Sequence, residues 1–126
     1  MGTDIHCHIE IKIEGRWEHY SNPIILRNYE MFGWLAGVRG PELQKITPLA
    51  LPEDINTVTR YHLEMYRESR HNSGCLNHEQ MVAWIKEFTE ELDEGHHPGL
   101  GYFYDNSWRY IPKGIEDVRM IFFFDN

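Results

Sequence analysis

The sequence predicts an α+β fold: a small, mostly antiparallel sheet of about four strands, in the sequence order ββαααββ, with three helices packed on one face. Three observations lead to this prediction. Residues 4–13 alternate between polar and apolar side chains, residues 81–92 repeat apolar side chains at helical spacing, and residues 118–124 form a continuous apolar run, VRMIFFF, of strand length.

The first two strands are expected to form a hairpin. The alternation over residues 4–13 is typical of a strand with one buried face. Glu14-Gly15 then supplies a turn, and residues 16–20 supply the second strand. The sequence Ser21-Asn22-Pro23 ends this pattern.

Two helices follow the hairpin. Asn28 is a typical N-cap for a first helix over residues 29–38, which Gly40-Pro41 ends. Residues 41–52 contain three prolines and are expected to be an irregular connection. The second helix covers residues 53–68, and its inward side chains are predicted to be Ile55, Val58, Tyr61, Met65 and Tyr66.

A polar loop over residues 69–75 precedes the third helix. Asn77 and Gln80 form a capping box at its start, and Gly95 ends it before a loop at residues 96–99. The apolar side chains at helical spacing are Met81, Trp84, Ile85, Phe88 and Leu92. Two last strands are expected within residues 102–110 and 118–124, of which the second is a central strand covered on both faces.

Composition narrows the class of protein. The 126 residues fit a single domain, 1–126, and 41% hydrophobic residues are enough for a core. Twelve Lys and Arg against twenty Asp and Glu give a net charge of −8, which disfavours binding to nucleic acid or anionic lipid. No apolar run approaches about 18 residues, no secretory leader is visible, and two cysteines make no disulfide framework. We therefore expect a soluble, cytoplasmic protein.

Eight histidines are the unusual feature of the composition. On the first strand, Asp4, His6 and His8 follow one another at every second residue, so their side chains share one face, with Cα atoms about 6.5–7 Å apart. Three interpretations stay open for this row. It forms a solvated face or subunit interface, it binds an anionic ligand such as a phosphate, or its H-x-H pair shares a metal ion with a carboxylate.

Further candidate ligand-binding residues lie where the helices begin and end. Arg27 and Asn28 precede the first helix, Arg39 follows it, and His71 and Ser73 lie in the loop before the third. Helix starts offer backbone N–H groups to an anion, and an Arg can bind a phosphate through two hydrogen bonds. The structural alternatives are an N-cap for Asn28, a helix-dipole partner for Arg39, and surface side chains for Arg27 and His71.

Four blocks of sequence resemble a family of small phage and bacterial proteins to which no activity is assigned. The blocks are MGTDIH at the start, RNYEMFGWLAGVRG at 27–40, HNSGCLN at 71–77 and FFFDN at 122–126. This chain departs from the family's loop at Gly74 and Cys75, where a polar residue and a Trp are expected. The resemblance indicates which proteins are related to this chain, but it does not indicate a reaction. A phage setting favours a protein that handles a host or signalling nucleotide inside the bacterial cell.

Three hypotheses for function follow. The first is a phage-type protein that captures a nucleotide or signalling cyclic nucleotide in a His/Asp/Arg pocket, with no cofactor and an anti-defence role. The second is a metal-dependent phosphodiesterase that uses Asp4, His6, His8 and His71 to hold zinc or manganese. The third is a structural or inhibitory interaction module, in which the polar face and exposed aromatic residues form the surface of a homo-oligomer or bind a partner.

Overall fold

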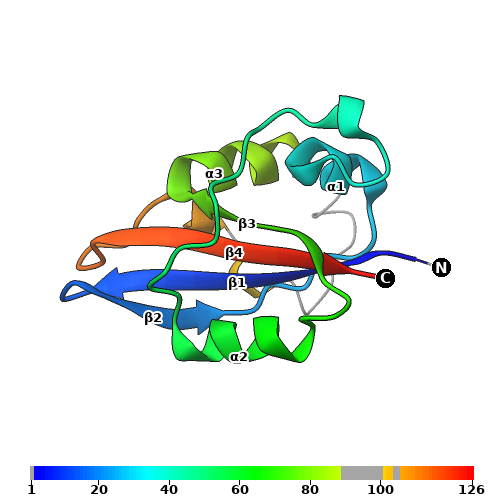
Figure 1. Cartoon of the computed structure of the whole chain (residues 1–126). Helices are drawn as coiled ribbons and strands as arrows, with labels where there is room; N and C mark the ends of the chain where they lie inside the picture. The colour runs from blue at the N-terminus through cyan, green and yellow to red at the C-terminus, as the bar shows by residue number, and fades with distance from the viewer. Residues whose placement is uncertain (1, 89–100, 104–105) are drawn as a thin grey trace.

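The computed structural model describes residues 2–88, 101–103 and 106–126 of the chain (Figure 1). The described strands are β1 (Asp4–Ile13), β2 (Arg16–Ser21), β3 (His71–Asn77) and β4 (Asp117–Asp125). The described α-helices are α1 (Tyr29–Ala36), α2 (Thr57–Met65) and α3 (His78–Glu87). Short 3-10 helices cover Pro41–Leu43, Gly101–Phe103 and Asn106–Arg109.

All described strands belong to one antiparallel sheet, in the spatial order β2-β1-β4-β3. This confirms the predicted α+β class, with a small antiparallel sheet and three helices in the described part of the chain. The predicted hairpin turn is present as well. Glu14 and Gly15 both have positive φ, at 50° and 76°, as a two-residue hairpin loop of right-handed twist requires.

The predicted order ββαααββ is wrong in the second half of the chain. Residues 71–77, expected to begin as a polar loop, form β3 between α2 and α3, so the observed order is ββααβαβ. The sequence does not predict this strand because the first residues of β3 are polar. Gly74 lets β3 approach its neighbour closely, because a Cβ there would lie 2.9 Å from the ring of Phe122.

The strand expected within residues 102–110 is also absent from the described residues of that region. They form two 3-10 helices instead, at Gly101–Phe103 and Asn106–Arg109. Glycine and asparagine at the starts of these helices favour turns over extended chain. The aromatic side chains still contribute to the core, since Tyr102, Phe103 and Trp108 are buried.

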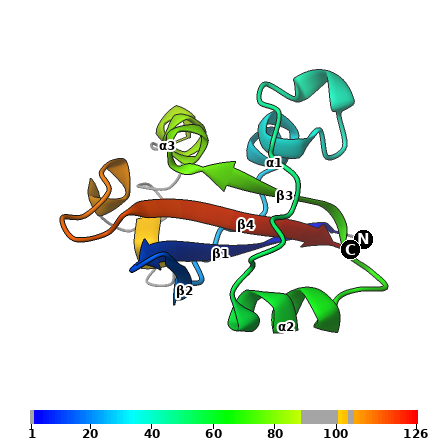
Figure 2. The same cartoon turned by 60° about the vertical axis from the view of Figure 1, so that its left-hand side comes forward.

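The helices lie on both faces of the sheet rather than on one. Helices α1 and α3 cover one face and α2 covers the other (Figure 2). Alternation along β4 explains this layout, because Phe122 and Phe124 belong to the large core under α1 and α3, whereas Phe123 packs with Leu63 of α2. The run VRMIFFF is therefore covered on both faces, as predicted for a central strand.

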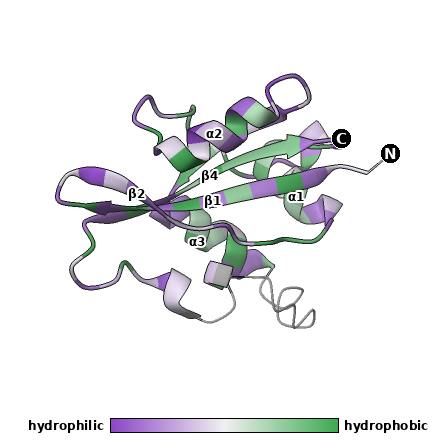
Figure 3. Cartoon of the chain, turned by 90° about the horizontal axis from the view of Figure 1, so that it is seen from below, coloured by the Kyte–Doolittle hydropathy of each residue, from purple (hydrophilic) through white to green (hydrophobic). Residues whose placement is uncertain are grey.

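Helix α2 packs through a different side from the predicted one. Val58, Tyr61 and Met65 were expected to face inward, but their exposed fractions are 53%, 69% and 63%. Thr59 and Leu63 are buried instead. The apolar spacing misleads here because the sheet face beneath α2 carries a polar row, which Figure 3 shows as alternating hydrophilic and hydrophobic segments along β1.

The ends of the helices also differ from prediction. Helix α1 stops at Ala36, where Gly37 takes a left-handed conformation, and α2 is shorter than the predicted 53–68. The capping box of Asn77 and Gln80 is present at the start of α3. Leu92, Gly95 and the loop at 96–99 lie outside the described residues. Within the described ranges, each helix is too short or too polar to cross a bilayer.

Candidate binding pocket beside the first strand

The candidate site lies where β1 has no strand partner on one side. Strand β2 pairs only with residues 9–13 of β1, so the edge of residues 4–8 is bordered by the irregular segment 22–27. A pocket of about 680 Å³ lies there, within the size range of small-molecule sites. Its lining residues are Asp4, Ile5, His6, Cys7, Asn22, Pro23, Ile24, Ile25, Leu26, Arg27 and His62.

His6 is held by a carboxylate from the neighbouring strand. Its Nε2 lies 3.0 Å from Oδ1 of Asp125, and both side chains are 22% exposed. Because an ionised carboxylate only accepts hydrogen bonds, Nε2 carries the proton and donates it. The ring is stacked on Phe123 at a centroid distance of 4.7 Å. His6 therefore has a fixed orientation, and its Nδ1 is left for a ligand.

Behind the pocket, three imidazoles form a hydrogen-bonded chain. His8 Nδ1 lies 3.0 Å from His19 Nε2, and His8 Nε2 lies 2.6 Å from His62 Nδ1. The amide of Asn22 sets the protonation of this chain, since its Nδ2 lies 3.4 Å from the carbonyl of Cys7 and 2.8 Å from His8 Nδ1. A backbone carbonyl only accepts, so Nδ2 is the donor at both contacts.

It follows that His8 accepts at Nδ1 and donates from Nε2 to His62. His62 then accepts at Nδ1 and carries its own proton at Nε2. His62 comes from α2 and lines the pocket, with its ring edge-on to that of His6 at 5.1 Å between centroids. The pocket thus receives one imidazole from the sheet and one from the helix above it.

Burial keeps this chain of imidazoles neutral. Burial first, and then the neighbouring imidazoles of His62 and His19, together lower the pKa of His8 to about 3. Burial also lowers the pKa of His62 and of His19. At neutral pH each of these rings has one donor and one acceptor, which is the condition for the chain to form.

Arg27 and Asp4 form the charged rim of the pocket. Arg27 binds the carboxylate through Nε at 2.8 Å and Nη2 at 3.2 Å, and both side chains are about half exposed. The hydrogen bond from Arg27 holds the pKa of Asp4 below its usual value. The guanidinium lies across Gly2, where a Cβ would come within 1.8 Å of Nη1, so only glycine allows this path.

Several candidates from the sequence lie away from this pocket. Asn28 is the N-cap of α1 and accepts from the backbone N–H groups of Glu30 and Met31. Arg39 lies over the ring of Tyr29 at 4.3 Å, on the side of the large core. Asn28 therefore has the structural role expected for its position, whereas Arg39 lies beyond the last turn of α1 and contacts Tyr29 and Thr3 instead of acting as a helix-dipole partner.

His71 and Ser73 also lie apart from the His6 row. His71 pairs with Phe124, and His6 with Phe123, so their side chains point to opposite faces of the sheet. His71 contacts the side chain of Asn126, and Ser73 Oγ accepts from Arg70 at 3.3 Å. Asp4, His6 and Arg27 are therefore brought together, with His8 behind them, whereas Arg39, His71 and Ser73 are not.

The metal hypothesis finds no support in this arrangement. Its four ligands do not converge, because His71 lies on the other face and the Asp4 carboxylate is bound by Arg27. Within the described residues, no group of three or more His, Cys, Asp or Glu side chains could hold a metal ion.

Sequence reasoning missed four contributors: Asn22, His62, His19 and, as a partner of His6, Asp125. Strand pairing brings Asp125 to β1 across 119 positions of sequence, which no local pattern reveals. His62 could have been found from helical spacing, since it lies one turn from Thr59 and Tyr66 on the side that faces the sheet.

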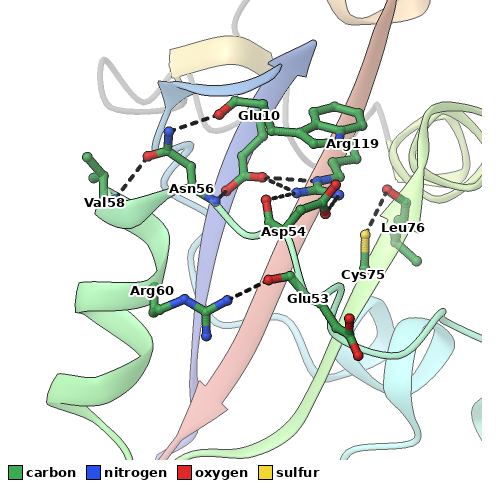
Figure 4. A network of polar contacts seen from close by, with 10 residues as sticks. Glu10, Glu53, Asp54, Asn56, Val58, Arg60, Cys75, Leu76 and Arg119 are labelled. Carbon is green, nitrogen blue, oxygen red and sulfur yellow. Dashed lines mark hydrogen bonds and ion pairs between the residues drawn. The ribbon is translucent and has the colours of Figure 1, made fainter. Parts of the chain in front are cut away.

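A buried ion pair positions α2 over the site (Figure 4). Glu10 is fully buried, and its Oε1 accepts from Arg119 Nε at 3.0 Å and Nη2 at 2.8 Å. Its Oε2 accepts from the backbone N–H of Asn56, the N-cap of α2, at 3.1 Å. The guanidinium of Arg119 also lies 3.9 Å from the ring centre of Trp17. Glu10, which lies on the same face of β1 as His6 and His8, therefore fixes the start of the helix that carries His62.

Comparison of the chain with protein-family models, with curated proteins and with solved structures gives no match. The functional argument therefore rests on the geometry of the site.

Proposed function

We propose that this protein binds a small anionic ligand of the nucleotide class in the pocket between β1, segment 22–27 and α2. The observation that carries this proposal is the meeting of Arg27, His6 and His62 at one pocket, from three separate parts of the chain. Arg27 and His62 offer donors that suit phosphate oxygens, Nδ1 of His6 offers an acceptor, and an apolar wall faces these side chains.

The two sides of the pocket suit the two parts of a nucleotide. Pro23, Ile24, Ile25 and Leu26 offer apolar surface to a base. On the polar side, His62 donates from Nε2, and Arg27 retains the N–H groups that Asp4 does not use. The local donors support anion binding in spite of the net charge of −8, because attraction depends on the local field.

In a phage setting, such a protein would lower the free concentration of a host or signalling nucleotide. Binding alone is sufficient for that effect, so this proposal requires no reaction. The anti-defence role rests on the family resemblance of the sequence and is part of the proposal.

Isothermal titration calorimetry of the full chain against nucleoside mono-, di- and triphosphates and cyclic nucleotides tests the proposal. We expect saturable binding of at least one of them, and a loss of about 10- to 100-fold in affinity for Arg27→Gln, since one charge-assisted pair contributes about 1.5–3 kcal/mol. Arg16→Gln is the matched control, because Arg16 is exposed on the β-hairpin and is not among the lining residues. Absence of binding across the panel, or equal losses in both variants, would contradict the proposal.

A further inference from the structure

We propose that the pocket also hydrolyses the cyclic phosphodiester of ribonucleoside 2′,3′-cyclic phosphates, with His6 as general base and His62 as general acid. This inference rests on the proposed function, because the substrate must first bind as a nucleotide. It goes beyond that function by assigning a reaction to the two imidazoles.

The geometry of the two rings carries the inference. His6 and His62 are edge-on at 5.1 Å between centroids, and both line the pocket. Each ring has one nitrogen engaged within the protein, Nε2 of His6 with Asp125 and Nδ1 of His62 with His8. Each therefore keeps one nitrogen for a substrate, and a base held by a carboxylate beside a second imidazole is an arrangement suited to acid–base catalysis.

The nucleophile in this pocket must be water. Among the lining residues the only thiol or hydroxyl belongs to Cys7, which belongs to the large core on the other face. Burial raises the pKa of that thiol, so it stays protonated and unreactive. A strained five-membered cyclic phosphate is a substrate that water can open with acid–base assistance alone.

The reaction balances as follows. His6 Nδ1 takes a proton from water while the water oxygen forms a bond to phosphorus. The bond from phosphorus to the 2′ oxygen breaks, and that oxygen takes a proton from Nε2 of a His62 that carries a second proton at Nδ1. Burial lowers the pKa of His62, so this form is a small fraction at neutral pH and a strong proton donor. The product is a 3′-monophosphate, and the two imidazoles regain their starting states by exchanging one proton with solvent.

The imidazole chain accommodates the protonated form of His62. When His62 carries a proton at Nδ1, His8 accepts it at Nε2 and holds its own proton at Nδ1, and the side-chain amide of Asn22 turns its Oδ1, in place of Nδ2, toward that nitrogen. Arg27 offers its remaining N–H groups to the non-bridging phosphate oxygens. His8 is thus a positioning residue, whereas His6 and His62 contact the reacting atoms.

The test follows conversion of 2′,3′-cyclic AMP by the untagged full chain in the presence of EDTA, with products separated by chromatography. Two variants remove only the catalytic nitrogen. In His6→Gln the amide replaces Nε2 and keeps the contact with Asp125, and in His62→Asn the amide replaces Nδ1 and keeps the contact with His8. We expect each to lower kcat by about 100-fold or more, since general acid–base catalysis contributes about 10²–10⁴.

Control variants separate chemistry from structure. His78→Gln alters a histidine that donates to the carbonyl of Trp108 away from the pocket, and it should leave the rate unchanged. Asp125→Asn should lower kcat by about tenfold with little change in KM, because it removes only the orienting charge. If His6→Gln or His62→Asn fails to fold, His6→Asn and His62→Gln serve as second variants.

Calorimetry with the product 3′-AMP, on the same samples, distinguishes the two proposals. Conversion that depends on both histidines supports the inference. Binding of 3′-AMP without conversion overturns the inference and leaves the binding function standing. The absence of both 3′-AMP binding and conversion overturns the inference, and the binding function is then decided by the nucleotide panel. Conversion that persists in both histidine variants overturns the assigned chemistry.

Discussion

The face of the sheet beneath α1 and α3 is apolar, whereas the face beneath α2 carries a row of polar side chains from the same strands. Ile5, Cys7 and Ile9 of β1 contribute to the large core, and the residues between them, His6 and His8, face α2. The two faces of the sheet thus have different roles. One supplies the apolar burial that stabilises the fold, and the other holds oriented imidazoles beside a pocket at the cost of a smaller core.

The largest expected effect is on the apolar face. Phe122→Ala removes a fully buried ring from the large core and should lower the free energy of unfolding by about 3–5 kcal/mol. Phe123→Ala is the matched variant on the other face, and we expect a smaller loss, because its neighbours His6 and His62 line a pocket that water can enter. Urea unfolding of both variants measures the difference, and a larger loss for Phe123→Ala would contradict the division between the faces.

The polar face has one site at which a substitution should be nearly as damaging. Arg119→Met leaves the buried carboxylate of Glu10 without its cation, which should cost about 3–5 kcal/mol of unfolding free energy. The double variant Glu10→Met/Arg119→Met should recover part of that loss, because no buried charge remains. Chemical denaturation of the two variants checks this, and no recovery in the double variant would show that the pair itself supplies the stability.

A smaller loss of unfolding free energy is expected when the pH is lowered. Burial lowers the pKa of His8 to about 3, so the folded state binds fewer protons there than the unfolded state does. The stabilisation is therefore present above the unfolded pKa of about 6.5 and is lost as pH falls toward 3, by about 2 kcal/mol from this residue at pH 5.

Thermal unfolding between pH 7 and pH 5 measures this loss. His8→Gln should flatten the dependence on pH, because glutamine does not titrate. An equally steep dependence in wild type and variant would place the acid sensitivity elsewhere.

The fold class was predictable because the strongest patterns are local. The alternation over 4–13, the turn at Glu14-Gly15 and the capping box at Asn77 each determine a local structure, and each is present. The side of the sheet that a helix covers is not local. Helix α2 has an apolar spacing at Val58, Tyr61 and Met65 that would suit a core, yet its other side meets the polar row of β1.

The site was predictable in part for the same reason. Asp4, His6 and His8 share one face because strand geometry requires it, and Arg27 reaches Asp4. His62 and Asp125 join them only through tertiary contacts. His71 lies on the opposite face because the strand that holds it pairs with β4 in a register that the sequence does not reveal.

Histidine ring NMR during a titration with AMP tests most directly whether the polar face is the binding face. We predict that the ring signals of His6 and His62 shift until saturation while those of His71 and His78 stay in place. Unmoved signals from His6 and His62, or a shift centred on His71, would contradict the assignment of ligand binding to the polar face.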